Sequence, residues 1–171
     1  MTQAMRVITA KAVFDGVNLL SNKAVLIADG VIIDLIDKDK VYDATQIEDF
    51  GNSVISAGLI DLQLNGNGGV LFNDSISFAS LETMHQTNLR FGTTSYLPTL
   101  ITSDLNDVRT ALEVTKEWFK QYGNTRGVIG LHLEGPFLSK EKRGIHPLEF
   151  VTLPTDAMLS EIASYTKYFP I

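Results

Sequence analysis

The segment GLHLEGPFLSKEKRGIHP, residues 130–147, places a carboxylate at the end of an apolar stretch. Glu134 follows Leu131 and Leu133 in what reads as a buried strand, and Gly135-Pro136 comes directly after it. Burying a carboxylate is costly unless something pairs with it. Glu134 is therefore either a structural carboxylate, paired with a basic side chain or capped by backbone amides, or a metal ligand or general base. The Gly-Pro turn favours the second alternative because it would aim the carboxylate into a cleft at the strand end.

The three histidines of the chain have different sequence surroundings. His132 lies in the same strand as Glu134, and we expect it to be a core residue with its hydrogen bonds satisfied. His146 lies in a polar loop after Lys142-Arg143-Gly144, where it is either solvated or contacts a substrate above the strand ends. His85 lies in a predicted helix and is expected to be structural or exposed. The basic pair before His146 could attract an anion, although a solvated loop is the simpler interpretation.

A second strand end carries amide side chains. Asp61, Gln63 and Asn65 alternate with leucines and share one face by the two-residue period of a strand. Neutral amides are weaker metal ligands than imidazole or carboxylate. Gln63 and Asn65 are thus either satisfied amides or groups that hydrogen-bond a sugar hydroxyl or a metal-bound water. The glycines that follow do not match the phosphate-loop pattern GxxxxGK[ST].

These polar groups need a scaffold that brings strand ends together. The hydrophobic pattern predicts strands over 54–64, 92–100 and 128–133, and helices over 78–91, 103–122 and 154–168. Three βα units in series, with strands apolar enough to be buried on both faces, predict an α/β fold with a parallel sheet. Ligands bind at the carboxyl ends of such strands.

The number of units is too small for a closed barrel. A (β/α)₈ TIM barrel takes ~250 residues, so we interpret residues 55–171 as the first part, roughly the N-terminal half, of such a barrel. A complete small α/β domain with an exposed edge is the alternative. Residues 1–54 precede it and predict a small antiparallel β-sheet or sandwich domain. Asp29-Gly30 between two apolar runs predicts a hairpin there.

The composition limits the class of protein. Apolar residues make up 44% and charged residues 20% of the chain, and the net charge is −6, as in soluble globular proteins. Neither a basic tract nor interleaved aromatics appear, which argues against nucleic acid or an anionic membrane as a partner. Without cysteine there is neither a disulfide nor a thiolate metal site. We expect a cytoplasmic protein, because no apolar run resembles a signal peptide or approaches the ~20 residues of a membrane span.

Three segments together resemble one enzyme family. VISAGLIDLQLNGNGGVLFND, GTTSYLPTL and GLHLEGPFLSKEKRGIHP are similar, in this order and at suitable separation, to the N-terminal half of N-acetylglucosamine-6-phosphate deacetylases. These enzymes belong to the amidohydrolase superfamily. The resemblance implies a (β/α)₈ barrel with a small β-sandwich made from both ends of the full chain. It also implies a reaction, the hydrolysis of N-acetylglucosamine 6-phosphate to glucosamine 6-phosphate and acetate.

The resemblance assigns roles by position. Glu134 matches the carboxylate ligand of a catalytic divalent metal, for which zinc, iron, manganese and cobalt are all suitable. Gln63 and Asn65 occupy the positions of a His-x-His pair in many amidohydrolases, which implies one metal ion rather than two. His146 matches a histidine that contacts the bound sugar.

Other parts of the family's site have no counterpart in this sequence. The proton-shuttling aspartate, two histidine metal ligands and the phosphate-binding residues are expected beyond Ile171, the last partly on a neighbouring subunit of a homodimer. Since a catalytic zinc normally has three protein ligands, we predict that the 171-residue piece alone is inactive.

Two alternatives remain. One is another amidohydrolase, of the dihydroorotase or hydantoinase type, although those usually carry His-x-His where Gln63-Leu64-Asn65 stands. The other is a truncated, non-catalytic binding or assembly module. An open half-barrel would leave apolar faces uncovered, and we expect such a piece to self-associate.

Overall fold

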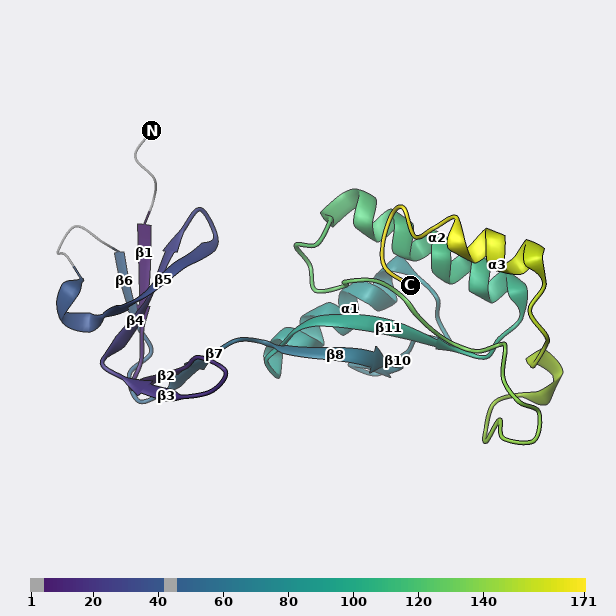
Figure 1. The fold of residues 1–171 in the computed structure, drawn as a ribbon, viewed down its shortest axis with the longest axis horizontal. Coiled ribbons are helices and arrows are strands. Elements are labelled where there is room, and N and C mark those ends of the chain that lie inside the picture. Colours follow the sequence, from purple (N-terminus) through teal and green to yellow (C-terminus); the bar gives the residue numbers. More distant parts are fainter. Residues whose placement is uncertain (1–4, 42–45) are drawn as a thin grey trace. The chain divides into compact units, whose positions relative to one another are not determined.

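The computed structural model of the chain describes residues 5–41 and 46–171. Residues 1–4 and 42–45, which the predicted domain 1–54 includes, lie outside the described residues. The chain divides into two compact units, Met1–Ala57 and Gly58–Ile171 (Figure 1). Each unit is described by itself.

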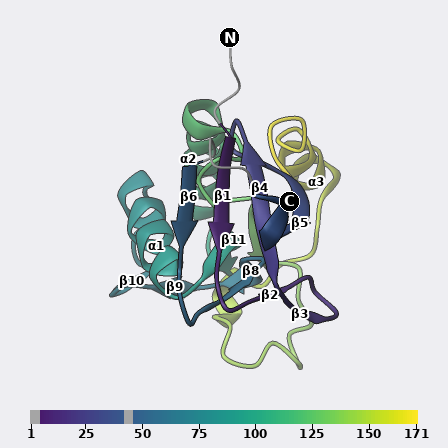
Figure 2. The ribbon, with the colours of Figure 1, turned by 90° about the vertical axis from the view of Figure 1, so that its left-hand side faces the viewer.

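The described part of the first unit is built from short strands and one 3₁₀ helix. Its elements are β1 (Met5–Thr9), β2 (Ala12–Phe14), β3 (Leu19–Ser21), β4 (Lys23–Ala28), β5 (Val31–Asp37), η1 (Lys38–Lys40), β6 (Gln46–Asp49) and β7 (Val54–Ser56). The strands form two sheets, with the orders β5-β4-β1-β6 and β3-β2-β7. In Figure 2 the strands β6, β1 and β4 of the first sheet lie side by side.

The pairing in this unit is mixed and not purely antiparallel as predicted. The hairpin of β4 and β5 is confirmed, with Asp29 and Gly30 at φ 49° and 78° in its turn. However, β6 runs parallel to β1, and β7 runs parallel to β2. Parallel neighbours need a crossover of a dozen or more residues, and the hairpin and η1 lie between the paired strands and supply that length. The local alternation of apolar and polar residues does not specify that β6 and β7 pair in parallel with β1 and β2.

The second unit has an α/β architecture. Its elements are β8 (Leu59–Leu64), β9 (Gly66–Asn67), β10 (Val70–Leu71), α1 (Phe78–Arg90), β11 (Thr93–Ile101), α2 (Leu105–Tyr122), β12 (His132–Glu134), η2 (Leu148–Phe150) and α3 (Asp156–Ala163). The strands β8, β11 and β12 form a parallel sheet with β11 in the centre. The mixed α/β fold and the parallel sheet predicted from the sequence are therefore confirmed for this unit.

Local signals in the sequence explain where the two long helices begin and end. Ser77 caps α1 by accepting a hydrogen bond from the backbone N–H of Ser80. Asp104 caps α2, where its carboxylate accepts from two backbone N–H groups of the first turn. Gly123 ends α2 at φ 56°, a conformation that suits glycine. These boundaries lie within one or two residues of the predicted ones.

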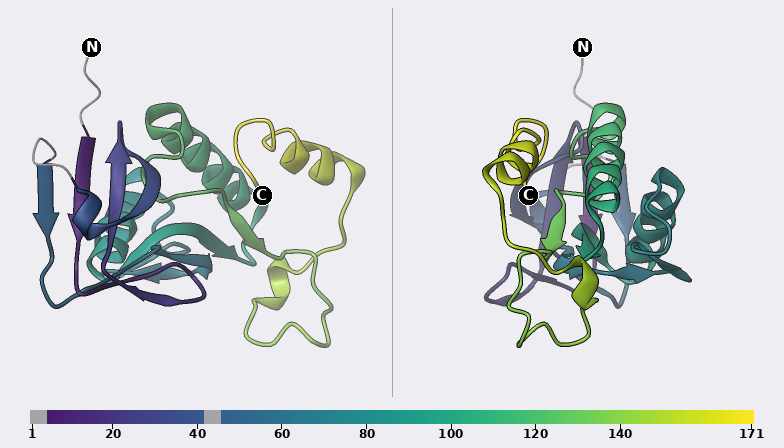
Figure 3. Two further views of the ribbon diagram at one scale, coloured as in Figure 1. Left: turned by 60° about the vertical axis from the view of Figure 1, so that its left-hand side comes forward. Right: turned by 90° about the vertical axis from the view of Figure 1, so that its right-hand side faces the viewer.

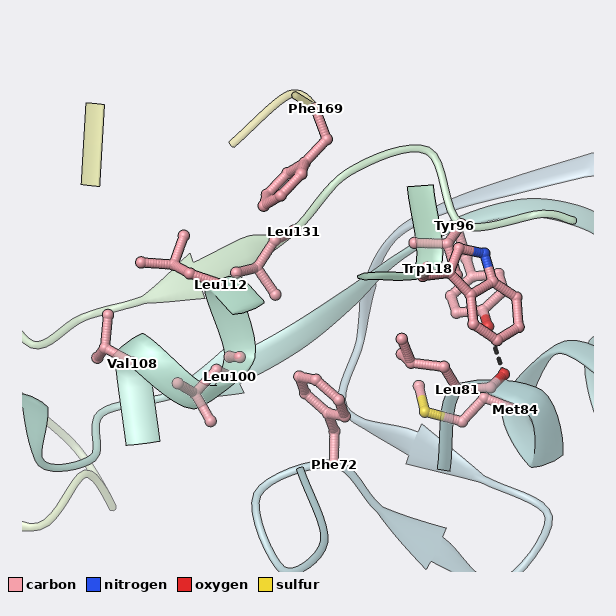
Figure 4. Close-up of a cluster of buried hydrophobic side chains, with 12 residues drawn as sticks. Phe72, Leu81, Met84, Tyr96, Leu100, Val108, Leu112, Trp118, Leu131 and Phe169 are labelled. Carbon is pink, nitrogen blue, oxygen red and sulfur yellow. Dashed lines mark hydrogen bonds between the residues drawn. The ribbon is translucent and has the colours of Figure 1, made fainter. Parts of the chain in front are cut away.

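The core of the second unit lies between the sheet and its helices. Trp118, Tyr96, Leu81 and Met84 are fully buried there (Figure 4). The Tyr96 hydroxyl donates to the carbonyl oxygen of Leu81 at 2.9 Å, which joins β11 to α1. Burial raises the pKa of Tyr96, so the phenol keeps its proton and remains a donor.

The three helices lie side by side, with α2 in the middle (Figure 3). On one side α2 packs against α1. On the other side, Arg109 of α2 forms a bidentate salt bridge with Glu161 of α3, at 2.6 and 3.0 Å. The helices therefore cover one face of the sheet and leave the other face to the polar residues considered below.

Two elements are shorter than predicted. The strand predicted over 128–133 is reduced to β12, His132–Glu134. Before it, Val128 forms only an isolated bridge to Tyr96, and the N–H of Leu131 donates to Pro170 O and not to a neighbouring strand. The last helix ends at Ala163, and the chain continues as tight turns with i→i+3 hydrogen bonds up to Tyr168. Within residues 5–41 and 46–171, no helix is long and apolar enough to cross a membrane.

Candidate active site

The sheet register places Glu134 on the face of the sheet away from the helices. Leu133 pairs with Leu100, and both contribute to the core beneath the helices. Glu134 is the next residue, paired with Ile101, so its side chain points to the opposite face. It is also the last residue of β12. The carboxylate therefore lies at the carboxyl end of the parallel sheet, where ligands bind in α/β folds.

The loop after β12 returns His146 to this carboxylate. The loop begins at Gly135 and extends beyond the end of the strand (Figure 3). Its two ends are joined because the N–H of Thr152 donates to Pro136 O at 3.1 Å. His146 Nε2 lies 3.6 Å from Glu134 Oε1, and the two side chains are 13% and 30% exposed. The structure thus brings together two residues that the sequence analysis singled out separately.

Thr102 joins these two residues and was missed by the sequence analysis. It follows β11 directly and is 2% exposed. Its Oγ1 lies 3.0 Å from His146 Nδ1 and donates a hydrogen bond to the backbone carbonyl oxygen of Glu134 at 3.1 Å. The one available signal was its place at the end of a predicted strand, since threonine is common at many other kinds of position.

Gly135 makes the close approach of Thr102 possible. A Cβ atom at position 135 would lie 2.0 Å from Thr102 Oγ1, and the backbone there has φ 104°. Both facts disfavour any residue with a side chain. The glycine that was expected to aim the carboxylate therefore also admits the threonine hydroxyl.

The end of β8 is built differently. Asp61 pairs with Tyr96 and Leu64 pairs with Pro98, so three residue steps on β8 match two on β11. This irregularity interrupts the strict alternation that was expected to place Asp61, Gln63 and Asn65 on one face. Bulges of this kind often occur next to active sites, where they redirect side chains.

The two amides of β8 make few contacts. Gln63 is exposed, and its backbone N–H donates to Asp61 Oδ1 at 3.0 Å. Asn65 is half-buried, and its backbone carbonyl accepts from Phe72 N at 2.8 Å. Among the described residues, neither side-chain amide has a hydrogen-bond partner. Both amides are therefore available to a ligand.

The other two histidines have different surroundings. His132 is half-buried, with its Nδ1 3.3 Å from Thr99 Oγ1. By the alternation of β12 it shares the face of Glu134 and not the core face of Leu133, so the expectation of a core residue is wrong. His85 is buried in α1 with its ring edge against Trp118. Burial lowers the pKa of His85, which favours the neutral ring in the folded protein. The alternative that His85 is exposed is wrong.

The donor set suits one part of a divalent metal site. Glu134 offers a partly exposed carboxylate whose one side-chain partner, among the described residues, is His146. Zinc and other divalent ions accept carboxylate oxygen as a ligand. However, the described residues hold no group of three His, Cys, Asp or Glu side chains that could bind a metal ion. The described residues therefore fit a metal ion only as part of a ligand set, with Glu134 as the one strong ligand.

A hollow of about 690 Å³ lies at a different place, between the end of α2 and residues 166–170. Lys116, Lys120 and Lys167 line it, which would suit an anion. Lys116, however, is already paired with Glu113 at 2.9 Å. The hollow also adjoins Gly123, where the chain leaves α2 toward β12, and so lies toward the amino ends of the strands. The carboxyl ends are the usual place for chemistry.

Comparison with known proteins gives consistent matches. No protein-family model matches the chain. N-acetylglucosamine-6-phosphate deacetylase of Haemophilus influenzae is 39% identical over 141 residues, 82% of this chain and 36% of the relative. N-acetylgalactosamine-6-phosphate deacetylase of a Shewanella species is 37% identical over 81% of this chain and 35% of the relative. The chain thus spans about a third of the length of these relatives.

A solved structure agrees with the sequence matches. The crystal structure of N-acetylglucosamine-6-phosphate deacetylase from Pasteurella multocida superimposes with a TM-score of 0.90 at 37% identity, covering 96% of this chain and 43% of that chain. Sequence and fold therefore point to the same enzymes. The resemblance noted in the sequence is confirmed, and over the part that it covers this chain is a member of the N-acetylglucosamine-6-phosphate deacetylase family.

Proposed function

We propose that the full-length protein containing this chain hydrolyses the acetamide of N-acetylglucosamine 6-phosphate, giving glucosamine 6-phosphate and acetate. The observation that carries this proposal is the meeting of Glu134 and His146 at the carboxyl end of β12. Both residues lie in the segment that resembles the deacetylases. The names of the relatives support the choice of reaction and substrate.

We infer that residues 55–171 form the first three βα units of a (β/α)₈ barrel and that residues 1–54 contribute to a β-sandwich domain. The parallel order β8-β11-β12 supports the barrel. So does the outer strand β8, whose Leu59, Ile60 and Leu62 are each at least 60% exposed. Apolar residues on an edge strand suit a position that a further strand covers. The rest of the barrel would then supply the residues that this chain lacks.

Each site residue has a role in this proposal. Glu134 would hold the divalent metal, which would supply a Lewis acid for the amide carbonyl and lower the pKa of a water molecule. His146 contacts the sugar, and its position beside Glu134 would bring the acetamide to the metal-holding carboxylate. Gln63 and Asn65 offer free amides for a sugar hydroxyl or a metal-bound water. The amine must gain a proton as the C–N bond breaks, and we assign that step to an aspartate outside this chain.

The proposal also covers the metal ion, the cellular location, the oligomeric state and the phosphate site. We propose one divalent ion per site, with zinc, iron, manganese or cobalt as candidates, and a cytoplasmic homodimer whose subunits share the phosphate site. The phosphate would be bound mainly outside this chain. In keeping with this, Lys142 is exposed, and Arg143 donates to its own loop at Lys140 O, 3.0 Å away.

The test is an assay of acetate release from N-acetylglucosamine 6-phosphate. We expect the zinc-loaded full-length protein to release acetate, a chelator to stop the reaction, and the 171-residue chain to be inactive with the same metal. Inactivity of the full-length protein with each of the four metals would contradict the proposed function. Turnover by the 171-residue chain would contradict the assignment of roles to residues outside it.

A second substrate has support from one relative. The Shewanella protein is a deacetylase of N-acetylgalactosamine 6-phosphate, with 37% identity to this chain. The two sugars differ in the configuration of one hydroxyl, so the contacts of a few polar groups decide between them. Measuring kcat/KM for both sugars with the same enzyme would show which is the better substrate. A higher value for the galactosamine derivative would favour this second function.

A further inference from the structure

Thr102 is placed to control the histidine of the site. Its side chain is almost completely buried, at 2% exposure, and it touches both partners of the Glu134–His146 pair. Thr102 reaches both residues from the end of the neighbouring strand β11. A buried hydroxyl between two site residues needs a complete account of its single hydrogen.

One arrangement makes both contacts of Thr102 hydrogen bonds at the same time. A backbone carbonyl can only accept, so the Thr102 hydroxyl hydrogen goes to Glu134 O, 3.1 Å away. The oxygen then presents a lone pair to His146 Nδ1, 3.0 Å away. For that contact to be a hydrogen bond, Nδ1 must carry the hydrogen and donate it. A neutral His146 therefore has its proton on Nδ1 and none on Nε2.

The second nitrogen then has a defined chemical role. An unprotonated Nε2 presents a lone pair, and Glu134 Oε1, which lies 3.6 Å away, is also an acceptor. Two acceptors that face each other favour a donor between or beside them. A sugar hydroxyl is such a donor, whereas a histidine with its proton on Nε2 would instead satisfy itself on the Glu134 carboxylate.

We propose that Thr102 is a positioning residue that fixes the Nδ1–H tautomer of His146, so that Nε2 accepts a hydrogen bond from a hydroxyl of the substrate. This inference rests on the proposed function for the identity of the hydroxyl compound. The tautomer itself rests only on the contacts of Thr102. Gly135 belongs to the same arrangement, because its missing side chain leaves room for the hydroxyl.

The tautomer can be measured without substrate. Long-range ¹H–¹⁵N correlation spectra of the zinc-loaded full-length enzyme, labelled at histidine, distinguish a protonated from an unprotonated ring nitrogen. The signals of His146 are those that the His146→Gln variant lacks. We expect Nδ1 protonated and Nε2 unprotonated in the wild type and in Thr102→Ser, which keeps the hydroxyl. Thr102→Val keeps the shape and removes the hydroxyl, and we expect it to lose this pattern.

Kinetics give an independent reading. Removing one partner of a buried hydrogen bond typically costs ~10-fold or more, so we expect Thr102→Val to raise KM by about that factor while kcat changes less. Thr102→Ser should stay within a few-fold of wild type. A proton on Nε2 of wild-type His146 would overturn the proposal, and so would an unchanged pattern in Thr102→Val. If Thr102→Val fails to fold, the wild-type spectrum still decides.

The two proposals fail in different ways. An enzyme that shows the expected tautomer but releases no acetate would contradict the proposed function and leave the positioning role standing. An active deacetylase with its proton on Nε2 would contradict only the positioning role.

Discussion

The ends of β12 and β8 lie in one parallel sheet but are built in different ways. At the end of β12, Glu134, His146 and Thr102 come from three separate segments and hold one another through contacts of 3.0, 3.1 and 3.6 Å. At the end of β8, the side chains of Gln63 and Asn65 have no hydrogen-bond partner among the described residues. One strand end is already organised, and the other is open.

This difference suggests a division of labour in the proposed enzyme. A metal ligand must be held in a fixed geometry, because its distance to the metal varies by only a few tenths of an ångström. Groups that hydrogen-bond a substrate hydroxyl tolerate more freedom and gain their partner when the substrate binds. The organised end therefore suits the metal, and the open end suits the sugar or a water molecule.

The largest effect is expected from Glu134→Gln, which keeps the shape of the side chain and removes its charge. We expect metal content to fall and acetate release by the full-length enzyme to drop by at least ~100-fold, since even partners behind a metal ligand contribute 10- to 100-fold. Glu141→Gln is the matched control, because Glu141 lies in the same loop and is exposed. If both variants lost metal and activity to the same extent, Glu134 would have no special role as a metal ligand.

The next effect is on stability. Gly135→Ala would bring a Cβ to 2.0 Å from Thr102 Oγ1 at a backbone φ of 104°. We expect the free energy of unfolding to fall by at least about 2 kcal/mol. Gly144→Ala in the same loop also has a positive φ, 63°, but meets no atom within 4 Å. Its expected cost is about 1 kcal/mol. Urea unfolding of the two variants would compare them, and a smaller loss for Gly135→Ala would mean that the contact is not tight.

A smaller effect is expected at the open end. Gln63→Ala and Asn65→Ala each remove one hydrogen-bonding group that has no protein partner. The loss of such a bond to the substrate is worth ~0.5–1.5 kcal/mol, or roughly 2- to 10-fold in KM. Stability should be nearly unchanged, because nothing in the described structure depends on these amides. A 100-fold loss of activity in either variant would show that the open end holds the metal as well.

The smallest effect concerns a histidine away from both strand ends. Burial lowers the pKa of His85 below the usual histidine value of 6.5, so between the folded and unfolded pKa values the unfolded chain binds more protons. Stability therefore rises with pH through this range and falls as the pH drops below 6.5. We expect the melting temperature to be lower at pH 5.5 than at pH 7.5, and His85→Phe to reduce the difference. If His85→Phe shows the same difference in melting temperature between the two pH values as the wild type, other groups cause the pH dependence.

Much of the second unit could be predicted because its signals are local. The caps Ser77 and Asp104 and the terminator Gly123 act within one turn of their helices, and the apolar strands between the helices imply parallel pairing. The hairpin around Asp29-Gly30 is local in the same way. Each of these features can be recognised in a window of a few residues.

Features that depend on distant segments were out of reach. The contact of Thr102 with His146 joins residues far apart in sequence, and either residue alone resembles an ordinary loop or strand-end residue. The irregularity of β8 depends on its register with β11. Likewise, the parallel pairing of β6 with β1 and of β7 with β2 depends on which earlier strands have a free edge. Glu134 and His146 were identified as candidates, but their closeness was not.

The parallel pairing of β6 with β1 and of β7 with β2 has a consequence for the order of folding. β4 and β5 are joined by a tight turn, whereas β6 pairs with β1 between residues such as Arg6 and Gln46, and β7 with β2 between residues such as Ala12 and Val54. Closing longer loops costs more chain entropy before any contact forms, which slows folding. We expect the hairpin to gain hydrogen-exchange protection first and β6 and β7 to gain it last. Protein synthesis would therefore deliver β8 almost as soon as the first unit can close, since only two residues, Ala57 and Gly58, separate β7 from β8.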